Sequence, residues 1–161
     1  MMNYEKISTK QIIMKTMNYL NVFLLLIAQV SIASAQEWQL DLNEAQKLAQ
    51  ETDRKIILVF SGSDWCAPCI KLEKEIWESA VFQAYAKDNY VLLRADFPRK
   101  KANKLSEEQA GKNGELAEKY NPDGYFPLVV VLDKRAAVLG NTGYKKMSPQ
   151  EYIKHLNSYV P

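Results

Sequence analysis

The sequence is poor in the residues that build metal sites and disulfide frameworks. Its 161 residues include two cysteines and one histidine, His155. A zinc site made of cysteine and histidine needs four ligands, so one chain cannot complete such a site from these residue types. Two cysteines also exclude the densely cross-linked scaffolds of small secreted proteins. No metal or other cofactor is expected, and His155 is expected at the surface or rim rather than in catalysis.

The sequence also lacks an excess of charge of either sign. The net charge of +2 comes entirely from residues 1–35, where three lysines face one glutamate, and residues 36–161 are formally neutral. Without a basic excess we expect binding neither to nucleic acid nor to an anionic membrane. Glycine-rich phosphate loops, internal repeats and low-complexity segments are missing as well.

Long apolar runs are missing too. The segment Leu20–Ala28 is shorter than the about 20 apolar residues that span a bilayer. It follows Lys15 and precedes Ala33-Ser34-Ala35, an A-x-A cleavage site. We therefore predict that residues 1–35 are a secretory signal peptide and residues 36–161 one domain exported across the inner membrane, to the periplasm. An uncleaved N-terminal membrane anchor is the alternative.

What the sequence does contain is the motif Trp65-Cys66-Ala67-Pro68-Cys69, directly after the apolar strand predicted over residues 55–60. A helix is predicted from Ala67 to about Trp77, so both sulfurs would lie on its first turn. Pro68 is tolerated there because its missing N–H would have no helical partner anyway. This spacing is typical of a disulfide that forms and breaks.

The two cysteines are predicted to have different roles. Cys66 would lie at the helix N-terminus, where unpaired N–H groups and the helix dipole favour a thiolate. Cys69 would lie deeper and be less acidic. We predict that Cys66 attacks a substrate disulfide, that Cys69 resolves the mixed disulfide, and that Trp65 shields the site.

Three other interpretations of the pair stay open. A structural disulfide within one turn would add little stability, because the entropic effect of a cross-link grows with the length of the loop it closes. The pair could instead be half of a zinc site, or two inert core cysteines.

The order strand, Trp-Cys-x-x-Cys, helix resembles the thioredoxin superfamily. Two further segments carry the resemblance: Tyr125–Asp133 is similar to the cis-proline loop and its following strand, and Thr142-Gly143-Tyr144 to the glycine turn before the last helix. The resemblance covers Trp38 to Tyr159 and is strongest to bacterial envelope thioredoxin-like proteins, including C-terminal domains of thiol:disulfide interchange proteins. It implies an α/β, thioredoxin-like fold with a central mixed β-sheet flanked by helices.

The resemblance also implies roles for individual residues. Pro127 would be the cis-proline that packs against the active-site disulfide, and Phe126 would pair by its backbone with the substrate. Phe60 stands where thioredoxins carry a buried aspartate that helps to deprotonate the resolving cysteine. Candidates to replace that aspartate, with water, are Asp64, Lys71 and Glu73.

Hydrophobic periodicity and capping residues place the remaining elements. Ile70 and Ile76 are expected to face inward from the helix that follows the cysteines. Three helices are predicted to begin at Leu42, Ser79 and Ser148, and a fourth is predicted to end at Tyr120. The other predicted strands are 90–96, 128–132 and 136–139. Between them, Phe97–Gly114 is the least regular segment. Its cluster Arg99, Lys100, Lys101 and Lys104 is either a solvated loop or a partner-binding one.

The resemblance implies a thiol–disulfide oxidoreductase. Ala67-Pro68 is similar to the Gly-Pro of reducing thioredoxins and lacks the histidine of strongly oxidising members, so reduction of protein disulfides in the bacterial envelope is favoured. Such an enzyme, expected to be a monomer, would need disulfide-containing client proteins and a membrane thiol electron donor. The alternatives are a disulfide oxidase or isomerase, and a non-catalytic module that binds a partner at Tyr125-Phe126.

Overall fold

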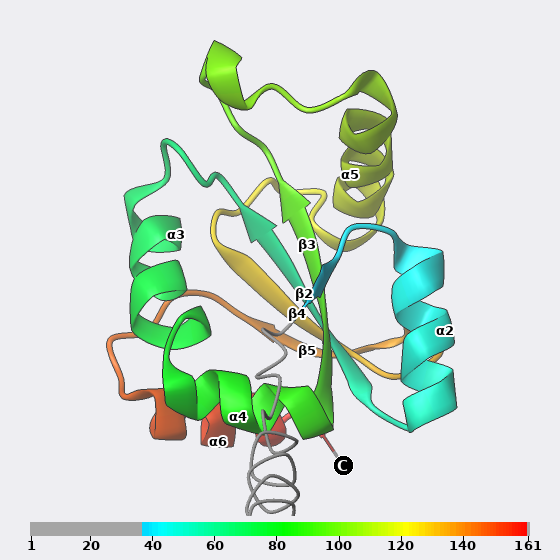
Figure 1. Cartoon of the computed structure of the whole chain (residues 1–161), viewed down its shortest axis with the longest axis vertical. Helices are drawn as coiled ribbons and strands as arrows, with labels where there is room; N and C mark the ends of the chain where they lie inside the picture. Colours follow the sequence, from blue (N-terminus) through cyan, green and yellow to red (C-terminus); the bar gives the residue numbers. More distant parts are fainter. Residues whose placement is uncertain (1–36, 161) are drawn as a thin grey trace, which may run out of the picture. The chain divides into compact units, whose positions relative to one another are not determined.

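The computed structural model describes residues 37–160, and the predicted signal peptide therefore lies outside the described residues. Within this range the strands form one mixed sheet in the order β1-β3-β2-β4-β5 (Figure 1). Strands β1, β3 and β2 are parallel, and β4 is antiparallel to both β2 and β5. The strands are β1 (Trp38–Gln39), β2 (Lys55–Ser61), β3 (Tyr90–Asp96), β4 (Leu128–Leu132) and β5 (Val138–Thr142).

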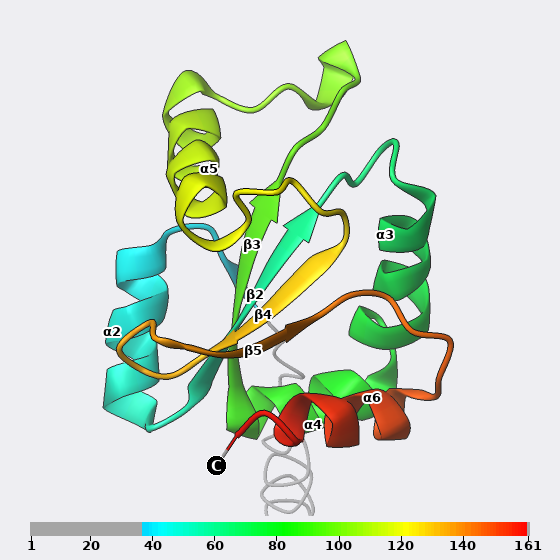
Figure 2. The same cartoon turned by 180° about the vertical axis from the view of Figure 1, so that it is seen from behind.

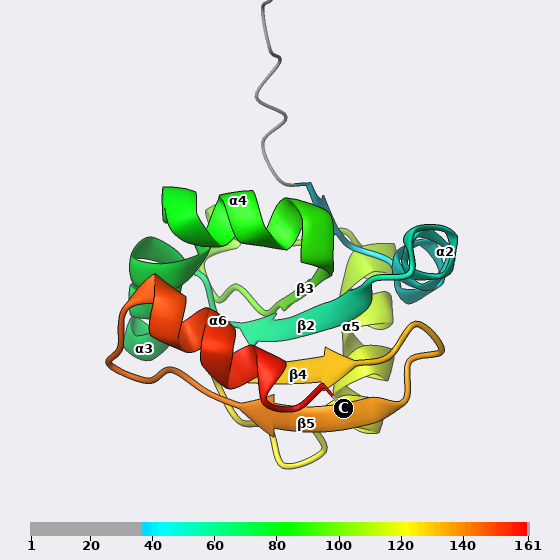
Figure 3. The ribbon, with the colours of Figure 1, turned by 90° about the horizontal axis from the view of Figure 1, so that it is seen from below.

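Helices cover both faces of the sheet (Figures 2 and 3). Along β2, Ile57 and Val59 pack into one core cluster, whereas Ile56, Leu58 and Phe60 pack into the other. This alternation buries the strand on both sides and explains its unbroken apolar sequence. One face is covered by α2 (Leu42–Thr52) and α5 (Glu107–Tyr120), and the other by α3 (Ala67–Leu72), the π-helical turn η1 (Glu73–Trp77), α4 (Ala80–Asn89) and α6 (Pro149–Asn157).

The register of β2 and β3 positions the candidate site. Ser61, the last residue of β2, lies opposite Asp96, the last residue of β3. The loop that carries the cysteines and the segment that starts at Phe97 therefore leave the same edge of the sheet side by side. Phe97 donates its N–H to the Ser61 carbonyl at 2.8 Å, which continues the pairing one step beyond the strands.

The predicted fold is confirmed, and so are several of the predicted boundaries. Strand β3 has the predicted bounds, and the helical segment after the cysteines ends at Trp77, with its last turn in π geometry. Asp41 caps α2 by accepting hydrogen bonds from two backbone N–H groups. The Ser148 capping box at the start of α6 forms in both directions.

Three predictions about the elements were wrong. Ile70 is exposed rather than inward, because Cys69 and Leu72 take the helix face that meets the sheet. Strand β5 starts at Val138 instead of Ala136, which has a positive φ of 62° in the turn that precedes it. The third concerns the extent of α5: its predicted end at Tyr120 is confirmed, but the helix has 14 residues and starts after the capping residue Ser106, in a segment for which no helix was predicted.

Candidate functional site

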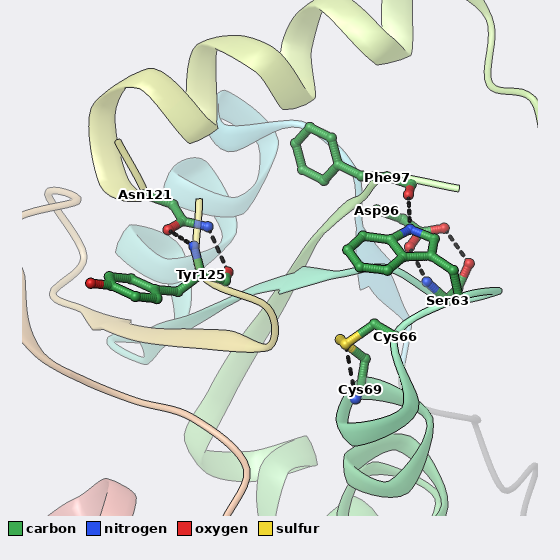
Figure 4. The surroundings of a disulfide bond; sticks show 8 residues. Ser63, Cys66, Cys69, Asp96, Phe97, Asn121 and Tyr125 are labelled. Carbon is green, nitrogen blue, oxygen red and sulfur yellow. Dashed lines mark hydrogen bonds between the residues drawn. A yellow bond between two sulfur atoms is a disulfide. The ribbon is translucent and has the colours of Figure 1, made fainter. Parts of the chain in front are cut away.

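Cys66 and Cys69 form a disulfide at the start of α3, with their Cα atoms 5.2 Å apart (Figure 4). Cys66 is the N-cap residue, and its sulfur accepts a hydrogen bond from the Cys69 N–H at 3.3 Å. Pro68 lies in the first turn, as predicted. The Cys69 N–H is in the first turn and has no acceptor within the helix, so it is free to point at the Cys66 sulfur. Such an N–H would stabilise a thiolate at Cys66 after reduction.

The expected difference in burial between the two cysteines is wrong, because each is 4% exposed. Cys66 sits outside the helix but is as well covered as Cys69 within it. What distinguishes the two sulfurs is their position relative to the helix N-terminus: within residues 37–160, backbone N–H groups donate to the Cys66 sulfur and not to the Cys69 sulfur. Their assignment as attacking and resolving residues remains a prediction.

Trp65 holds the disulfide loop against the segment that follows β3. Its indole Nε1–H donates to the Phe97 carbonyl at 2.7 Å, and the Arg99 guanidinium carbon lies 3.7 Å from the centroid of its ring. Close backbone approach makes Gly62 necessary, since a Cβ there would come within 2.4 Å of the Trp65 ring. The tryptophan is thus fixed on several sides directly beside Cys66.

The predicted cis-proline loop lies on another side of Trp65. The Phe126–Pro127 peptide bond is cis, and the Phe126 ring makes edge contacts with Trp65 at 5.4 Å and with Phe97 at 5.5 Å. Buried Asn121 clamps this loop: its side-chain amide donates to the Tyr125 carbonyl and its oxygen accepts the Tyr125 N–H (Figure 4). The structure therefore brings the residues around Pro127 to the residues around Cys66.

Polar side chains that sequence reasoning missed join the two loops at the edge of the sheet. The Asp96 carboxylate accepts the backbone N–H and the hydroxyl of Ser63 (Figure 4), and buried Asn113 donates to the Asp96 carbonyl. Gln109 in turn donates to the Asn113 side-chain oxygen. The one available signal was Asp96 itself, a carboxylate at the carboxyl end of a predicted central strand.

The three candidates to replace the missing buried aspartate lie in different surroundings. The Asp64 carboxylate accepts the N–H groups of Arg99 and Lys100 and the Asn103 side-chain amide; the Arg99 hydrogen bond is the main cause that lowers its pKa below the ordinary value. Lys71 is exposed. Neither residue lines the pocket that Cys69 lines.

Glu73 is different, because it lines a pocket of about 310 Å³ together with Cys69, Ser61 and Arg94. One guanidinium nitrogen of Arg94, Nη2, donates to both carboxylate oxygens of Glu73, at 2.8 and 2.9 Å, and the guanidinium carbon lies 4.1 Å from the Trp38 ring centroid. Phe60 is fully buried in the cluster under α2 and α5. The carboxylate of Glu73, which shares this pocket with Cys69, thus comes from the π-helical turn after α3 rather than from β2.

His155 lies on α6, half-buried, with its Nε2 2.9 Å from the Thr142 hydroxyl oxygen. Burial is the main cause that lowers the pKa of His155. Among residues 37–160, no group of three or more His, Cys, Asp or Glu side chains could hold a metal ion. No helix in the same range is long and apolar enough to cross a membrane.

Comparison with known proteins assigns this geometry to a family. A family model described as thioredoxin-like matches residues 37–134. The chain belongs to the thioredoxin-like family. It is 34% identical over 128 residues to the disulfide bond reductase DsbH of Chlamydia pneumoniae, a match that covers 79% of this chain and 75% of DsbH.

Solved structures agree with this membership. A structure of DsbH oxidoreductase superimposes with a TM-score of 0.72 at 30% identity, over 82% of this chain and 89% of that one. The C-terminal domain of DsbD from Neisseria meningitidis shares the fold, with a TM-score of 0.51 at 18% identity over 73% of this chain and 90% of that one. Together with the Cys66–Cys69 pair, the similarity to DsbH supports thiol–disulfide oxidoreductase activity.

Proposed function

We propose that this thioredoxin-like domain reduces disulfides of client proteins in the bacterial cell envelope. The observation that carries the proposal is the Cys66–Cys69 disulfide at a helix start, held beside a cis-proline loop. The similarity to a disulfide bond reductase supports the direction, as does the Ala67-Pro68 pair between the cysteines. The predicted signal peptide, residues 1–35, supports the location.

In the reduced enzyme the Cys66 thiolate attacks one sulfur of the client disulfide. A bond forms between Cys66 and that sulfur, and the other client sulfur leaves as a thiolate and takes up a proton. The Cys69 sulfur, deprotonated, then attacks the Cys66 sulfur and displaces the second client thiol. Two electrons pass to the client, and the Cys66–Cys69 disulfide is the oxidised product.

Glu73 is the proton acceptor for Cys69 in this scheme. Its carboxylate follows Cys69 by four residues, which puts the two on the same side of the helix, and both line one pocket that is large enough for water. The proton of the Cys69 thiol passes through water to Glu73, which Arg94 holds in place by two hydrogen bonds. This arrangement takes the part of the aspartate that Phe60 replaces.

The loop that ends at Pro127 is the platform for the client chain. Strand β4 begins at Leu128, so the backbone of Phe126 lies beyond the sheet pairing. Phe126 also touches Trp65, the neighbour of Cys66. An extended client segment that pairs with the Phe126 backbone would bring its disulfide to Cys66. A membrane thiol carrier then restores the dithiol, because an envelope reductase requires a supply of electrons.

A trapping experiment tests the proposal against the alternative of a passive binding module. We predict that the Cys69→Ser variant accumulates mixed disulfides with client proteins through Cys66, because the resolving thiol is absent. Non-reducing gels before and after dithiothreitol measure them. The Cys66→Ser variant is the matched control and should trap far less. If Cys69→Ser traps no more protein than Cys66→Ser, the enzyme proposal fails.

A further inference from the structure

We propose that the surface formed by Arg99, Lys100, Lys101 and Lys104 binds an acidic segment of the client protein beside the reacting disulfide. This basic surface belongs to the segment that connects the end of β3 to the start of α5. Figure 1 shows that this segment projects beyond the edge of the sheet. The inference rests on the proposed reductase function and adds the chemical class of its substrate.

The four cations of the basic surface are exposed and available. The ion pairs recorded within residues 37–160 involve other cations, namely Arg94, Lys112, Lys134 and Arg135. The Asp64 carboxylate hydrogen-bonds to two backbone N–H groups and an amide of this segment, and its attraction to Lys100 is the weakest of the causes that lower its pKa. Because residues 36–161 are neutral as a whole, this concentration of positive charge is a local feature.

The basic surface is fixed relative to the disulfide. Asp64, two residues before Cys66, accepts the N–H groups of Arg99 and Lys100 at 2.9 and 3.0 Å. The Arg99 guanidinium stacks on Trp65, the residue next to Cys66. The client segment bound by these cations would therefore lie only a few residues, along the client chain, from the disulfide that Cys66 attacks.

An apolar pocket lies among the cations. It has a volume of about 290 Å³, and its walls combine the four cations with Phe97, Pro98, Leu105 and Ala110. Asp96 and Asn113 line it as well, and the Asp96 carboxylate there accepts two hydrogen bonds from Ser63. A pocket of this kind fits one apolar side chain, with carboxylates on either side of it meeting the lysines. The occupant that matches both features is a peptide segment with an apolar residue flanked by Asp or Glu.

The test uses disulfide-linked peptides that carry an Asp-Leu-Glu-Asp segment near one cysteine, and matched peptides with Asn-Leu-Gln-Asn. In low salt we predict a kcat/KM about tenfold higher for the acidic peptide, through KM, since clustered charge raises encounter rates by ~10–10³. The Lys100→Gln/Lys101→Gln/Lys104→Gln variant should lose this preference. The control Lys47→Gln/Lys87→Gln/Lys154→Gln, which removes equal charge from exposed sites elsewhere, should keep it.

Two further measurements separate this inference from the proposed function. Reduction of a small uncharged disulfide should be equal in all three proteins; if it is absent in all, the reductase proposal fails. Fluorescence anisotropy with the unreactive Cys66→Ser/Cys69→Ser protein measures peptide binding without any redox step. Equal binding of acidic and neutral peptides would overturn the inference. So would binding to anionic lipid vesicles that depends on the three lysines, without a peptide preference.

Discussion

At the scale of single residues, resolution of the mixed disulfide depends on how Cys69 loses its proton. Phe60 fills the core under α2 and α5 and has no group that accepts a proton. Glu73 supplies a carboxylate in the pocket that Cys69 lines, and its ion pair with Arg94 is only partly exposed, at 32% and 22% of the two side chains. In the proposed mechanism the proton acceptor therefore lies on the helical segment that follows the cysteines rather than on the strand.

We predict that Glu73→Gln slows the release of the second client thiol from the mixed disulfide about tenfold at pH 7. A general acid or base typically contributes ~10²–10⁴ to the rate. The expected loss is smaller because water in the pocket can accept the proton instead. The defect should shrink as the pH rises toward about 8.5, the ordinary pKa of a thiol, where deprotonation needs less help. Stopped-flow fluorescence of Trp65 at several pH values measures the rate.

The matched control is Glu51→Gln, which removes one exposed carboxylate from α2 on the opposite face. It should leave both the rate and its pH profile unchanged. A Glu73→Gln variant with the same slow rate at every pH would indicate a loss of structure rather than of a proton acceptor, and would contradict the assigned role.

The local sequence predicted the redox pair and the place of Pro68, and the resemblance to the thioredoxin superfamily predicted the cis bond at Pro127. Neither predicted Asp96 or Asn113, because their hydrogen bonds join positions 33 and 17 residues apart in the chain. The sequence also did not predict that Cys66 is buried. The neighbouring Trp65 ring is held by Phe97, Arg99 and Phe126, which are distant in the chain. Long-range partners of this kind leave no periodic pattern in a sequence.

At the scale of elements, the positions of β2, β3 and β4 follow from apolar runs in the sequence, whereas the connections depend on individual hydrogen bonds. Strand β5 starts two residues late because Asp133 accepts the N–H groups of Arg135 and Ala137 and so extends the turn. Helix α5 was underestimated because Gly111 and Gly114 weaken its helical pattern. Ser106 caps it nevertheless.

The segment after β3 is held by Asp64, and we predict that Asp64→Ala loosens it. Removing the acceptor of two backbone N–H groups should lower the hydrogen-exchange protection of Arg99 and Lys100 several-fold, since each N–H loses its hydrogen bond to a charged group. Amide exchange followed by mass spectrometry measures this change. The variant Asp88→Ala, on α4, is the control and should leave that protection intact.

The same contact gives a pH dependence with a definite sign. The pKa of Asp64 is lowered in the fold, first by the Arg99 N–H. Its contribution is therefore complete above the ordinary value of 3.8 and is lost as the pH falls through the lower folded value. Protection of Arg99 that is unaffected by both Asp64→Ala and acid would contradict this role.

At the scale of the whole molecule, the described domain has a thioredoxin-like fold. The loop between β2 and α3, the cis-proline loop and the basic surface meet at one edge of its sheet. The family and fold could be predicted from Trp65–Cys69 and Pro127, because both landmarks are local in sequence. The direction of electron flow could not, because it depends on the relative stability of the dithiol and the disulfide.

The reduction potential of the Cys66–Cys69 pair therefore tests the central claim most directly. It is measured by equilibrating the domain with glutathione buffers of known potential and quantifying the two redox forms. A protein-disulfide reductase should have a potential near about −270 mV, the value of thioredoxin. A potential near about −120 mV, that of a strong oxidant, would contradict the proposed function.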